Sequence, residues 1–368
     1  TGLFYAPLPG SELPEVPEEP TDVDLRAAVE CVGDVLQDFP FDSEASRANA
    51  VACILTPLVR NLVDGQVPLA LIDKPQAGTG ASLLAQIVGI IALGNPGHMV
   101  SASRSDEEWR KSVTAALIAG APVLTIDNVE DELRSPSLAM ALTTSTWSDR
   151  ILGKSQTITL PQRCTWIATG NNIRLGGDLP RRSYWIRMDA KTAQPWRTRT
   201  FKYLDLIARV QEQRGQLLAG VVTVYRYWVQ QERPLPDAVP RLAGFDNWVR
   251  LMAGLTAVMG YPSFLGNLDT MYAEADQEAP QWEAFLEWVD ETWPEPFKTQ
   301  EVGLRLEGDP DLWDIIPDEL GPPTKPDFST LLGRAFRKKA GYRLPSGLWI
   351  EKAGSRQRAN LWTIEGGR

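Results

Sequence analysis

The sequence predicts an α/β core in which a parallel sheet is covered by helices on both faces. Three observations carry this prediction: short apolar runs of strand length, helical apolar spacing between them, and a glycine-containing loop that joins the first run to an apolar helix. Strands that alternate with helices favour a parallel sheet, because each connection has to cross back over the sheet. The expected strands lie at residues 68–73, 122–127, 164–169 and 184–188.

Helical spacing and end signals define the expected helices. Asp42 or Ser43 is the expected N-cap of the second helix, which Gly65 ends. Ser105 and Glu108 form a predicted capping box at the start of another helix. The expected helices span residues 22–38, 43–64, 81–93, 105–120, 136–145, 200–231, 239–260 and 328–339, with at least one more within 266–320.

The composition fits a globular protein of more than one domain. With 368 residues, of which 43% are hydrophobic and 23% charged, the chain is long enough for two or three domains with sizeable cores. The basic helix near the C-terminus precedes two short strand-like runs, 348–352 and 359–364, and this combination is typical of a winged-helix module. The expected domains are an acidic flexible linker (1–21), an N-terminal helical lead-in (22–66), the α/β core (67–200), a helical region (201–296) and a winged-helix domain (297–368).

Cysteine and histidine usage indicates a reducing compartment. The separated residues Cys31, Cys53 and Cys164 do not suit a disulfide framework, and with His98 as the single histidine no zinc site is expected. We therefore expect a cytoplasmic location. No apolar stretch reaches the length of a membrane span, so no membrane partner is expected. Because the sequence begins with Thr1, we expect it to be part of a longer protein.

The formal net charge of −10 argues at first against a nucleic-acid partner, but the charge is unevenly distributed. Residues 147–214 carry 13 basic and 5 acidic side chains, and residues 321–368 carry 10 basic and 3 acidic ones. The acidic excess lies in residues 1–24 and in residues 266–320, where 16 acidic side chains accompany 2 basic ones. The two basic regions are therefore candidates for contact with nucleic acid.

The loop between the first strand and its helix resembles a phosphate-binding Walker A loop, G-x-x-x-x-G-K-[ST]. Gly80 and Ser82 match this pattern, whereas Pro75 stands at the first glycine and Ala81 at the lysine. The backbone amides of such a loop and the following helix N-terminus hold phosphates. An ordinary strand–turn–helix connection is the alternative interpretation. The candidate nucleotide-binding residues are Pro75, Gln76, Ala77, Gly78, Thr79, Gly80, Ala81 and Ser82.

Two further strand ends favour a nucleotide site. The second expected strand ends in Asp127, as a Walker B strand does when it delivers a carboxylate to magnesium. The third is followed by Asn171, whose amide is suited to orienting an attacking water. Acids and amides also occur at strand ends as turn formers. The order and spacing of all three elements nevertheless favour ATP and Mg²⁺ as ligands.

With these motifs, the chain resembles AAA+ ATPases of the superfamily 3-like helicase group, found in replication proteins of phages, plasmids and integrated mobile elements. The resemblance covers about residues 22–190. It implies an AAA+ P-loop ATPase core, a homo-oligomeric ring such as a hexamer, DNA as a partner, and a primase domain or protein as a further one. The stretches that carry it are residues 39–41, 54–57, 77–82, 126–128, 150–153, 169–172 and 177–182.

Ala81 departs from the family pattern. By the resemblance, Ser82 and Asp127 are the Mg²⁺ ligands, and a lysine at position 81 would reach the β- and γ-phosphates. We interpret Ala81 as an introduced substitution of this lysine, which leaves the chain inactive in hydrolysis. A natural pseudo-ATPase is the alternative.

The catalytic base is not fixed by the motif. Most AAA+ proteins follow the Walker B aspartate with glutamate, but here Asn128 stands in that place, and a neutral amide cannot accept a proton. Glu130 or Asp131 is the alternative base. Asn171 is the expected sensor residue, with Asn172 as the alternative.

Arg181 and Arg182 follow the sensor strand, where AAA+ proteins place an arginine finger that reaches the nucleotide of the neighbouring subunit. Arg150 is a second candidate. A surface pair bound to nearby acids is the alternative interpretation of Arg181 and Arg182.

The basic regions contain the candidate DNA contacts. Two short strands are expected over residues 150–160, with Lys154 at the tip of the hairpin, where superfamily 3 helicases grip the phosphate backbone. A solvated lysine is the alternative there, and protein docking is the alternative for the C-terminal module. The tryptophans at positions 282, 288, 293 and 313 are expected in the core. The candidate DNA-binding residues are Lys154, Arg337, Lys338, Lys339, Arg356 and Arg358.

The sequence therefore predicts an ATP-driven, ring-forming DNA helicase or translocase that serves replication of a mobile genetic element. The alternatives are an AAA+ helicase loader or initiator that assembles on DNA without unwinding it, and a pseudo-ATPase interaction protein.

Overall fold

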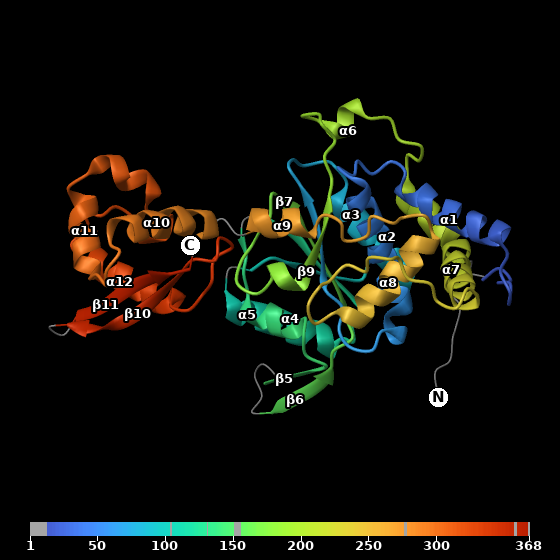
Figure 1. Ribbon diagram of the computed structural model, residues 1–368. Helices are drawn as coiled ribbons and strands as arrows, with labels where there is room; N and C mark the ends of the chain where they lie inside the picture. Colours follow the sequence, from blue (N-terminus) through green and yellow to red (C-terminus); the bar gives the residue numbers. More distant parts are fainter. Residues whose placement is uncertain are drawn as a thin grey trace. The chain divides into compact units, whose positions relative to one another are not determined.

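The chain folds into two compact units, Thr1–Ala275 and Asp276–Arg368 (Figure 1). The boundary lies inside the stretch 201–296, for which the sequence predicts one helical region. The predicted helical lead-in belongs to the first unit together with the α/β core. The computed structural model describes residues 13–103, 105–130, 132–150, 156–275, 278–356 and 359–366.

The first unit is built on a five-stranded parallel sheet with the order β2-β3-β7-β1-β9. The four predicted strands are present, and the α/β prediction is confirmed. β2 was not predicted, because it is a short edge strand whose residues alternate between half-buried and exposed positions. The strands are β1 (Leu69–Lys74), β2 (His98–Ser101), β3 (Val123–Val129), β7 (Thr165–Asn171) and β9 (Ser183–Arg187).

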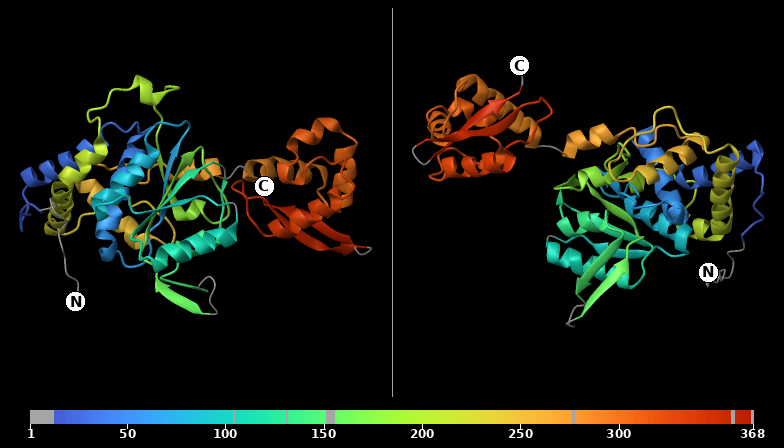
Figure 2. Two further views of the ribbon diagram at one scale, coloured as in Figure 1. Left: turned by 180° about the vertical axis from the view of Figure 1, so that it is seen from behind. Right: turned by 60° about the horizontal axis from the view of Figure 1, so that its bottom comes forward.

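The strand order places helices on both faces of the sheet. The chain crosses from β1 to the far edge at β2 and then returns through β3 and β7. Right-handed crossovers that run in opposite directions put their helices on opposite faces. Accordingly, α3 (Ala81–Leu93) lies on one face, and α4 (Asp106–Ile118) and α5 (Pro136–Ala141) lie on the other (Figures 1 and 2).

Further helices pack around α3 and complete the core of this unit. α3 packs against α2 and α7, and α7 packs against α1 and α8. The Arg214 guanidinium of α7 donates hydrogen bonds to the carbonyl oxygens of Ile90, Ile91 and Ala92 in the last turn of α3, where helical donors run out. The Ile90 carbonyl also accepts a hydrogen bond from the Gly94 amide. The other helices are α1 (Asp22–Leu36), α2 (Glu44–Val59), η1 (Arg60–Leu62), η2 (Pro180–Arg182), α6 (Pro195–Thr198), α7 (Leu206–Gln230), α8 (Asp246–Val258) and α9 (Leu268–Ala275).

The helix ends confirm one predicted cap and correct another. The Ser43 hydroxyl accepts a hydrogen bond from the Ser46 amide and caps α2, as predicted. Ser105 is the N-cap residue of α4, but its side chain makes no capping hydrogen bond, so the predicted capping box is wrong. Glu108 instead pairs with Lys111, which lies on the same exposed side of the helix.

Two small sheets extend the first unit. β5 (Thr146–Arg150) and β6 (Thr157–Pro161) form an antiparallel hairpin, and β4 (Glu132–Leu133) pairs with β8 (Arg174–Leu175). A hairpin was predicted, but its first strand ends at Arg150 rather than starting there. Trp147 fixes this register because it buries its ring and donates a hydrogen bond to the Thr114 hydroxyl on α4.

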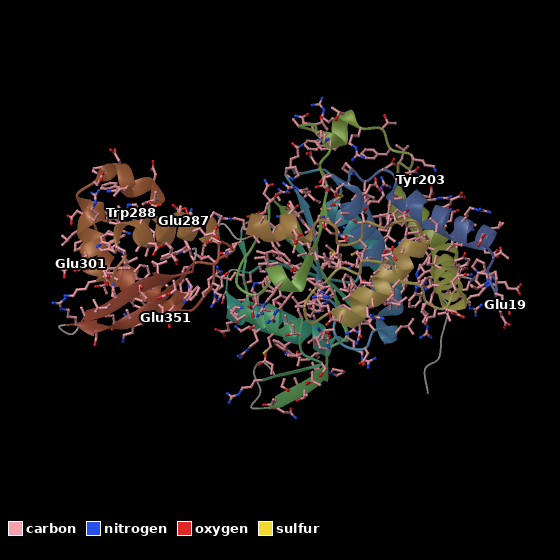
Figure 3. The ribbon with its side chains drawn as sticks, in the orientation of Figure 1. Glu19, Tyr203, Glu287, Trp288, Glu301 and Glu351 are labelled. Carbon is pink, nitrogen blue, oxygen red and sulfur yellow. The ribbon has the colours of Figure 1, made fainter. Side chains whose placement is uncertain are left out.

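The second unit has its own core of aromatic side chains. Trp282 and Phe285 of α10 pack on Phe336 of α12, and Trp362 of β11 completes the cluster. Trp288 (Figure 3) and Trp293 are half-buried beside it. Trp313 is 37% exposed, so its predicted core position is wrong. The elements are α10 (Glu278–Thr292), α11 (Thr299–Glu307), η3 (Pro310–Ile315), η4 (Asp318–Leu320), α12 (Phe328–Lys339), β10 (Trp349–Arg356) and β11 (Ala359–Glu365).

Across the described stretches of the chain, we find no helix long and apolar enough to cross a membrane.

Candidate functional site

The loop between β1 and α3 has the backbone of an anion-binding loop. Gly78 and Gly80 adopt φ angles of 80° and 104°, which residues with a side chain rarely adopt. Gly80 is the N-cap of α3 and has no side chain with which to cap the helix. The first amides of α3 therefore remain available to a ligand, and the helix dipole favours a negative one.

Ser82, Asp127 and Thr169 meet beside this helix N-terminus. The Ser82 hydroxyl donates a 2.7 Å hydrogen bond to Oδ1 of Asp127, and the Thr169 hydroxyl donates a 2.6 Å bond to the same oxygen. The backbone amide of Asn128 in turn donates a 3.2 Å hydrogen bond to Oγ1 of Thr169. The two predicted magnesium ligands, Ser82 and Asp127, are thus in contact, although α3 and β3 are far apart in the sequence.

A bulge in β3 accounts for the position of Asp127. The register between β3 and β7 shifts between Ile126 and Val129, and Asn128 adopts a φ angle of 57°. Such a bulge changes the direction in which neighbouring side chains leave the strand. The bulge lies at the carboxyl end of the strand, where ligands bind in open α/β sheets.

Asn171 ends β7 and is joined to Lys74, the last residue of β1. The Lys74 ammonium donates a 2.7 Å hydrogen bond to Oδ1 of Asn171 and a 3.4 Å one to the Gly170 carbonyl. Burial lowers the pKa of Lys74, and the carboxylates of Asp73 and Asp127 oppose this shift. Burial also raises the pKa of Asp73, whose carboxylate accepts a hydrogen bond from the Ile173 amide. Asn172, the alternative sensor, donates through its side chain to the Pro75 carbonyl at 3.4 Å.

The donor set of Ser82 and Asp127 fits Mg²⁺. This ion prefers oxygen ligands and is usually held by one or two carboxylates together with substrate phosphates and water. A hydroxyl and a carboxylate oxygen in contact beside a phosphate-type loop supply such a set. No group of three or more His, Cys, Asp or Glu side chains suited to a metal ion occurs among the residues that the structure describes.

Glu130, one of the two alternative bases, directly follows the last residue of β3. The Asn128 side-chain amide donates a 3.2 Å hydrogen bond through Nδ2 to Oε1 of Glu130, and both residues are exposed. Asp131, the other alternative, lies outside the described residues.

Arg181 and Arg182 both bind Asp178, at 2.6 Å and 2.8 Å. Their exposure differs, because the Arg182 side chain is 17% exposed and the Arg181 side chain 63%. Arg182 also donates to the Ala139 carbonyl and to the Thr143 hydroxyl, which fixes it on the C-terminal end of α5. Arg181 is thus the more accessible of the two.

The connection between β9 and α7, which includes α6, lies against the loop. Gln76 donates a 2.5 Å hydrogen bond to the Thr192 carbonyl. The Trp196 indole lies so close to Gly78 that a methyl group there would collide with it. Phe39, in one of the stretches that carry the family resemblance, is the nearest neighbour of a side chain at Gly80.

The predicted DNA-binding residues differ in how far they are free to bind. Arg337, Lys338 and Arg356 are exposed on the second unit. The Lys339 ammonium instead lies 3.3 Å from the Glu278 carboxylate and 4.9 Å from the centre of the Trp282 ring, which holds it within that unit. The other two predicted contacts, Lys154 and Arg358, lie outside the described residues.

The sequence reasoning missed Lys74 and did not assign Thr169. The sequence contains evidence for both residues. Lys74 ends an apolar strand directly before a glycine-containing loop, and a lysine is unusual in a buried parallel sheet. Thr169 stands two residues before the sensor candidate on the same strand, so it lies on the same face.

No protein-family model and no curated protein matches the chain. Among solved structures, the chain is similar to the apo form of the C-terminal region of NrS-1, with a TM-score of 0.45 and 13% sequence identity. The match covers 98% of this chain and 79% of that chain. A similarity of this extent assigns neither a family nor a function.

Proposed function

We propose that this chain is the ATPase and translocase part of an AAA+ helicase of the superfamily 3-like group, acting on DNA in the replication of a mobile genetic element. The observation that carries the proposal is the meeting of the Ser82 hydroxyl, the Asp127 carboxylate and the Thr169 hydroxyl beside a helix N-terminus without a side-chain cap. This arrangement is suited to a phosphate group and its cation.

Each part of the site has a distinct task in this proposal. The loop amides and the first amides of α3 bind the phosphates, while Ser82 and Asp127 hold Mg²⁺, which neutralises phosphate charge when bound. Thr169 keeps the Asp127 carboxylate in place through its 2.6 Å hydrogen bond. Asn171 orients the attacking water. Glu130, the first acidic residue after Asp127 along the chain, is the proposed proton acceptor.

The proposed assembly is a ring, and the family resemblance favours a hexamer. Arg181 is the better finger candidate because it is exposed, whereas Arg182 is held on α5. An arginine supplied by the neighbouring subunit stabilises developing phosphate charge and couples hydrolysis to assembly.

The second unit is proposed as a winged-helix module that contacts duplex DNA. This proposal is supported by the three α-helices and the antiparallel hairpin of the described second unit, together with the Phe297–Trp362 bridge. Arg337, Lys338 and Arg356 are the exposed cations suited to phosphate contacts. The β5–β6 hairpin of the first unit is proposed to contact the single strand in the ring channel, with Lys154, which lies between its two strands in the sequence, as the contact predicted there.

Nucleotide binding and strand separation test the proposal. Fluorescent ATP should bind in the presence of Mg²⁺, and Asp127→Asn should weaken this binding about tenfold or more, because a charged ligand of the cation is lost. Asp246→Asn, an exposed helix-end aspartate distant in sequence from the site, is the matched control. Unwinding of forked DNA by the chain supports the helicase, and the absence of any nucleotide binding contradicts the proposal.

A loader or initiator is the second candidate function. Ala81 and Asn128 favour it, because they remove the usual phosphate-binding lysine and the usual base while the binding loop is retained. ATP-dependent assembly on DNA without unwinding supports this alternative.

A further inference from the structure

We propose that Lys74 supplies the cation that the loop lacks at position 81, and that its ammonium binds the terminal phosphate of the nucleotide. The inference rests on the proposed nucleotide site. It replaces the interpretation of Ala81 as a disabling substitution, because the positive charge is then moved to the other end of the same loop.

The sheet register brings Lys74 to the right place. Lys74 and Asn171 are paired residues of the neighbouring parallel strands β1 and β7, so their side chains leave the sheet on the same face. The Lys74 Nζ atom lies 2.7 Å from the Asn171 Oδ1 atom. β3, the next strand along, provides Asp127. The ammonium therefore lies among the carboxyl ends of three adjacent strands, where the sensor amide and the magnesium ligand are also found.

The surroundings of this ammonium leave a role for an anion. Lys74 is 8% exposed, and a buried charge is costly unless it is paired. Its hydrogen-bond acceptors are a neutral amide oxygen and a neutral carbonyl oxygen, which use two of its three donors. The carboxylates of Asp73 and Asp127 act on the Lys74 charge, but neither accepts a hydrogen bond from its ammonium within the described part of the chain. An incoming phosphate would give Lys74 the counter-charge that its hydrogen-bond partners do not provide.

The loop itself provides a second, independent sign of a ligand. Thr79 is 3% exposed, and its hydroxyl has no hydrogen-bond partner within the described part of the chain. Buried polar atoms are rarely left without a partner. Lys74 immediately precedes residues 75–80 of this loop and Ala81 immediately follows them, so the two positions flank the amides that would hold the anion.

Variants that remove the charge but keep the shape test the inference. Lys74→Gln keeps a hydrogen-bond donor toward Asn171 without the charge, and Lys74→Met removes both. With Mg²⁺ present, we expect both variants to bind ATP about 10- to 100-fold more weakly than the parent chain, as expected for losing a hydrogen bond to a charged group. The affinity of these two variants for AMP, which lacks the terminal phosphates, should fall by less than about threefold. Lys74→Arg should retain most of the ATP affinity. Lys111→Met is the matched control, because Lys111 is a surface lysine of α4 whose side chain is 37% exposed.

Relocating the charge provides the decisive comparison. Lys74→Gln combined with Ala81→Lys should regain ATP affinity, because the cation then stands at the usual Walker A position. Thermal melting shows whether each variant is folded. If both neutral variants unfold, Ala81→Lys alone replaces them: it should gain less than about threefold in ATP affinity, because Lys74 already supplies the charge, and a gain of about tenfold or more would overturn the inference. If the parent chain binds ATP and the neutral variants bind ATP and AMP as well as it does, the inference is wrong and the proposed function stands. If the parent chain binds no nucleotide, both fail.

Discussion

The Trp196 indole lies against the α-carbon of Gly78 in the glycine-containing loop. This contact, together with the hydrogen bond from Gln76 to the Thr192 carbonyl, connects the segment between β9 and α7 to the residues proposed to bind phosphate. The shape of the loop therefore depends on a segment that follows it in the sequence by more than a hundred positions.

We expect Gly78→Ala to weaken nucleotide binding and to lower the free energy of unfolding by about 1–3 kcal/mol. The added methyl group would collide with Trp196 and also strain the backbone at its φ angle of 80°. Gly65→Ala is the matched control, because Gly65 has a φ angle of 107° and no neighbour within 4 Å of the added methyl group. Calorimetry and ATP titration measure the two effects. If the two variants lose the same unfolding free energy and the same ATP affinity, the Trp196 contact does not determine the shape of the loop.

Thr169→Val should reduce both stability and Mg²⁺-dependent nucleotide binding. The substitution keeps the shape of the side chain but removes the hydrogen-bond donor to Asp127, and it leaves the backbone amide of Asn128 without its acceptor. We expect the free energy of unfolding to fall by about 1–3 kcal/mol. Thr125→Val on β3 is the control: Thr125 is 1% exposed, and its hydroxyl is without a hydrogen-bond partner among the described residues. Urea denaturation should show that Thr125→Val is at least as stable as the parent chain. A Thr169→Val protein as stable as the parent chain would contradict the proposed support of Asp127.

Arg214→Met should destabilise the first unit by about 1–3 kcal/mol, because the last carbonyl groups of α3 lose a charged hydrogen-bond donor. The exposed Arg241→Met serves as the comparison. Hydrogen exchange should show faster exchange at the C-terminal end of α3 in the Arg214 variant. Unchanged exchange there would mean that packing alone holds this end of the helix.

The pH dependence of stability should include a contribution from Asp34. Burial acts to raise the pKa of this carboxyl, but hydrogen bonds from Lys202 and Tyr203, at 2.6 Å and 2.7 Å, outweigh burial and hold the pKa below its ordinary value. A lowered folded-state pKa stabilises the protein above the ordinary pKa, near 4, and this contribution is lost as the pH falls through the folded-state value. Asp34→Asn should therefore cost about 1 kcal/mol near pH 7 and less at acidic pH. Denaturation curves of the parent chain, Asp34→Asn and the exposed Glu30→Gln measure the difference, and a cost that grows as the pH falls would contradict the assignment.

Cysteine labelling should report unfolding of the first unit. Burial raises the pKa of Cys53 to about 12, and it also raises the pKa of Cys164; both side chains are at most 1% exposed. Thiolate is the reactive form, so neither should react with iodoacetamide near pH 8 in the folded protein, whereas the half-buried Cys31 should react slowly. Mass spectrometry after labelling in denaturant should show all three modified. Rapid labelling of Cys164 in the folded protein would contradict its place in the core.

Local patterns in the sequence predicted most of the sheet and its helices. Two of these patterns predict their elements clearly, because turn or cap residues bound each of them: the apolar run ending at Asp127 and the helix over Ala81–Leu93. β2 lacks that signal, because it is short and half-exposed at the sheet edge. The first hairpin strand was placed too late, since its position depends on where Trp147 packs, and a local pattern does not contain that information.

The candidate site was predictable residue by residue but not as a set of contacts. Ser82 and Asp127 follow from the loop and strand patterns, and the structure brings them together. The bulge at Asn128 and the pairing of Lys74 with Asn171 depend on strand register, which tertiary packing fixes. The engagement of Lys339 with Glu278 likewise joins residues that are distant in the sequence. A basic helix therefore does not reveal which of its cations are free.

The separate hydrophobic cores of Thr1–Ala275 and Asp276–Arg368 have a consequence for the history of the chain. Recombination at their boundary would leave each core whole, because the buried cluster of one unit contains no residue of the other. The C-terminal unit is thus exchangeable as a block, without altering the residues proposed to bind the nucleotide.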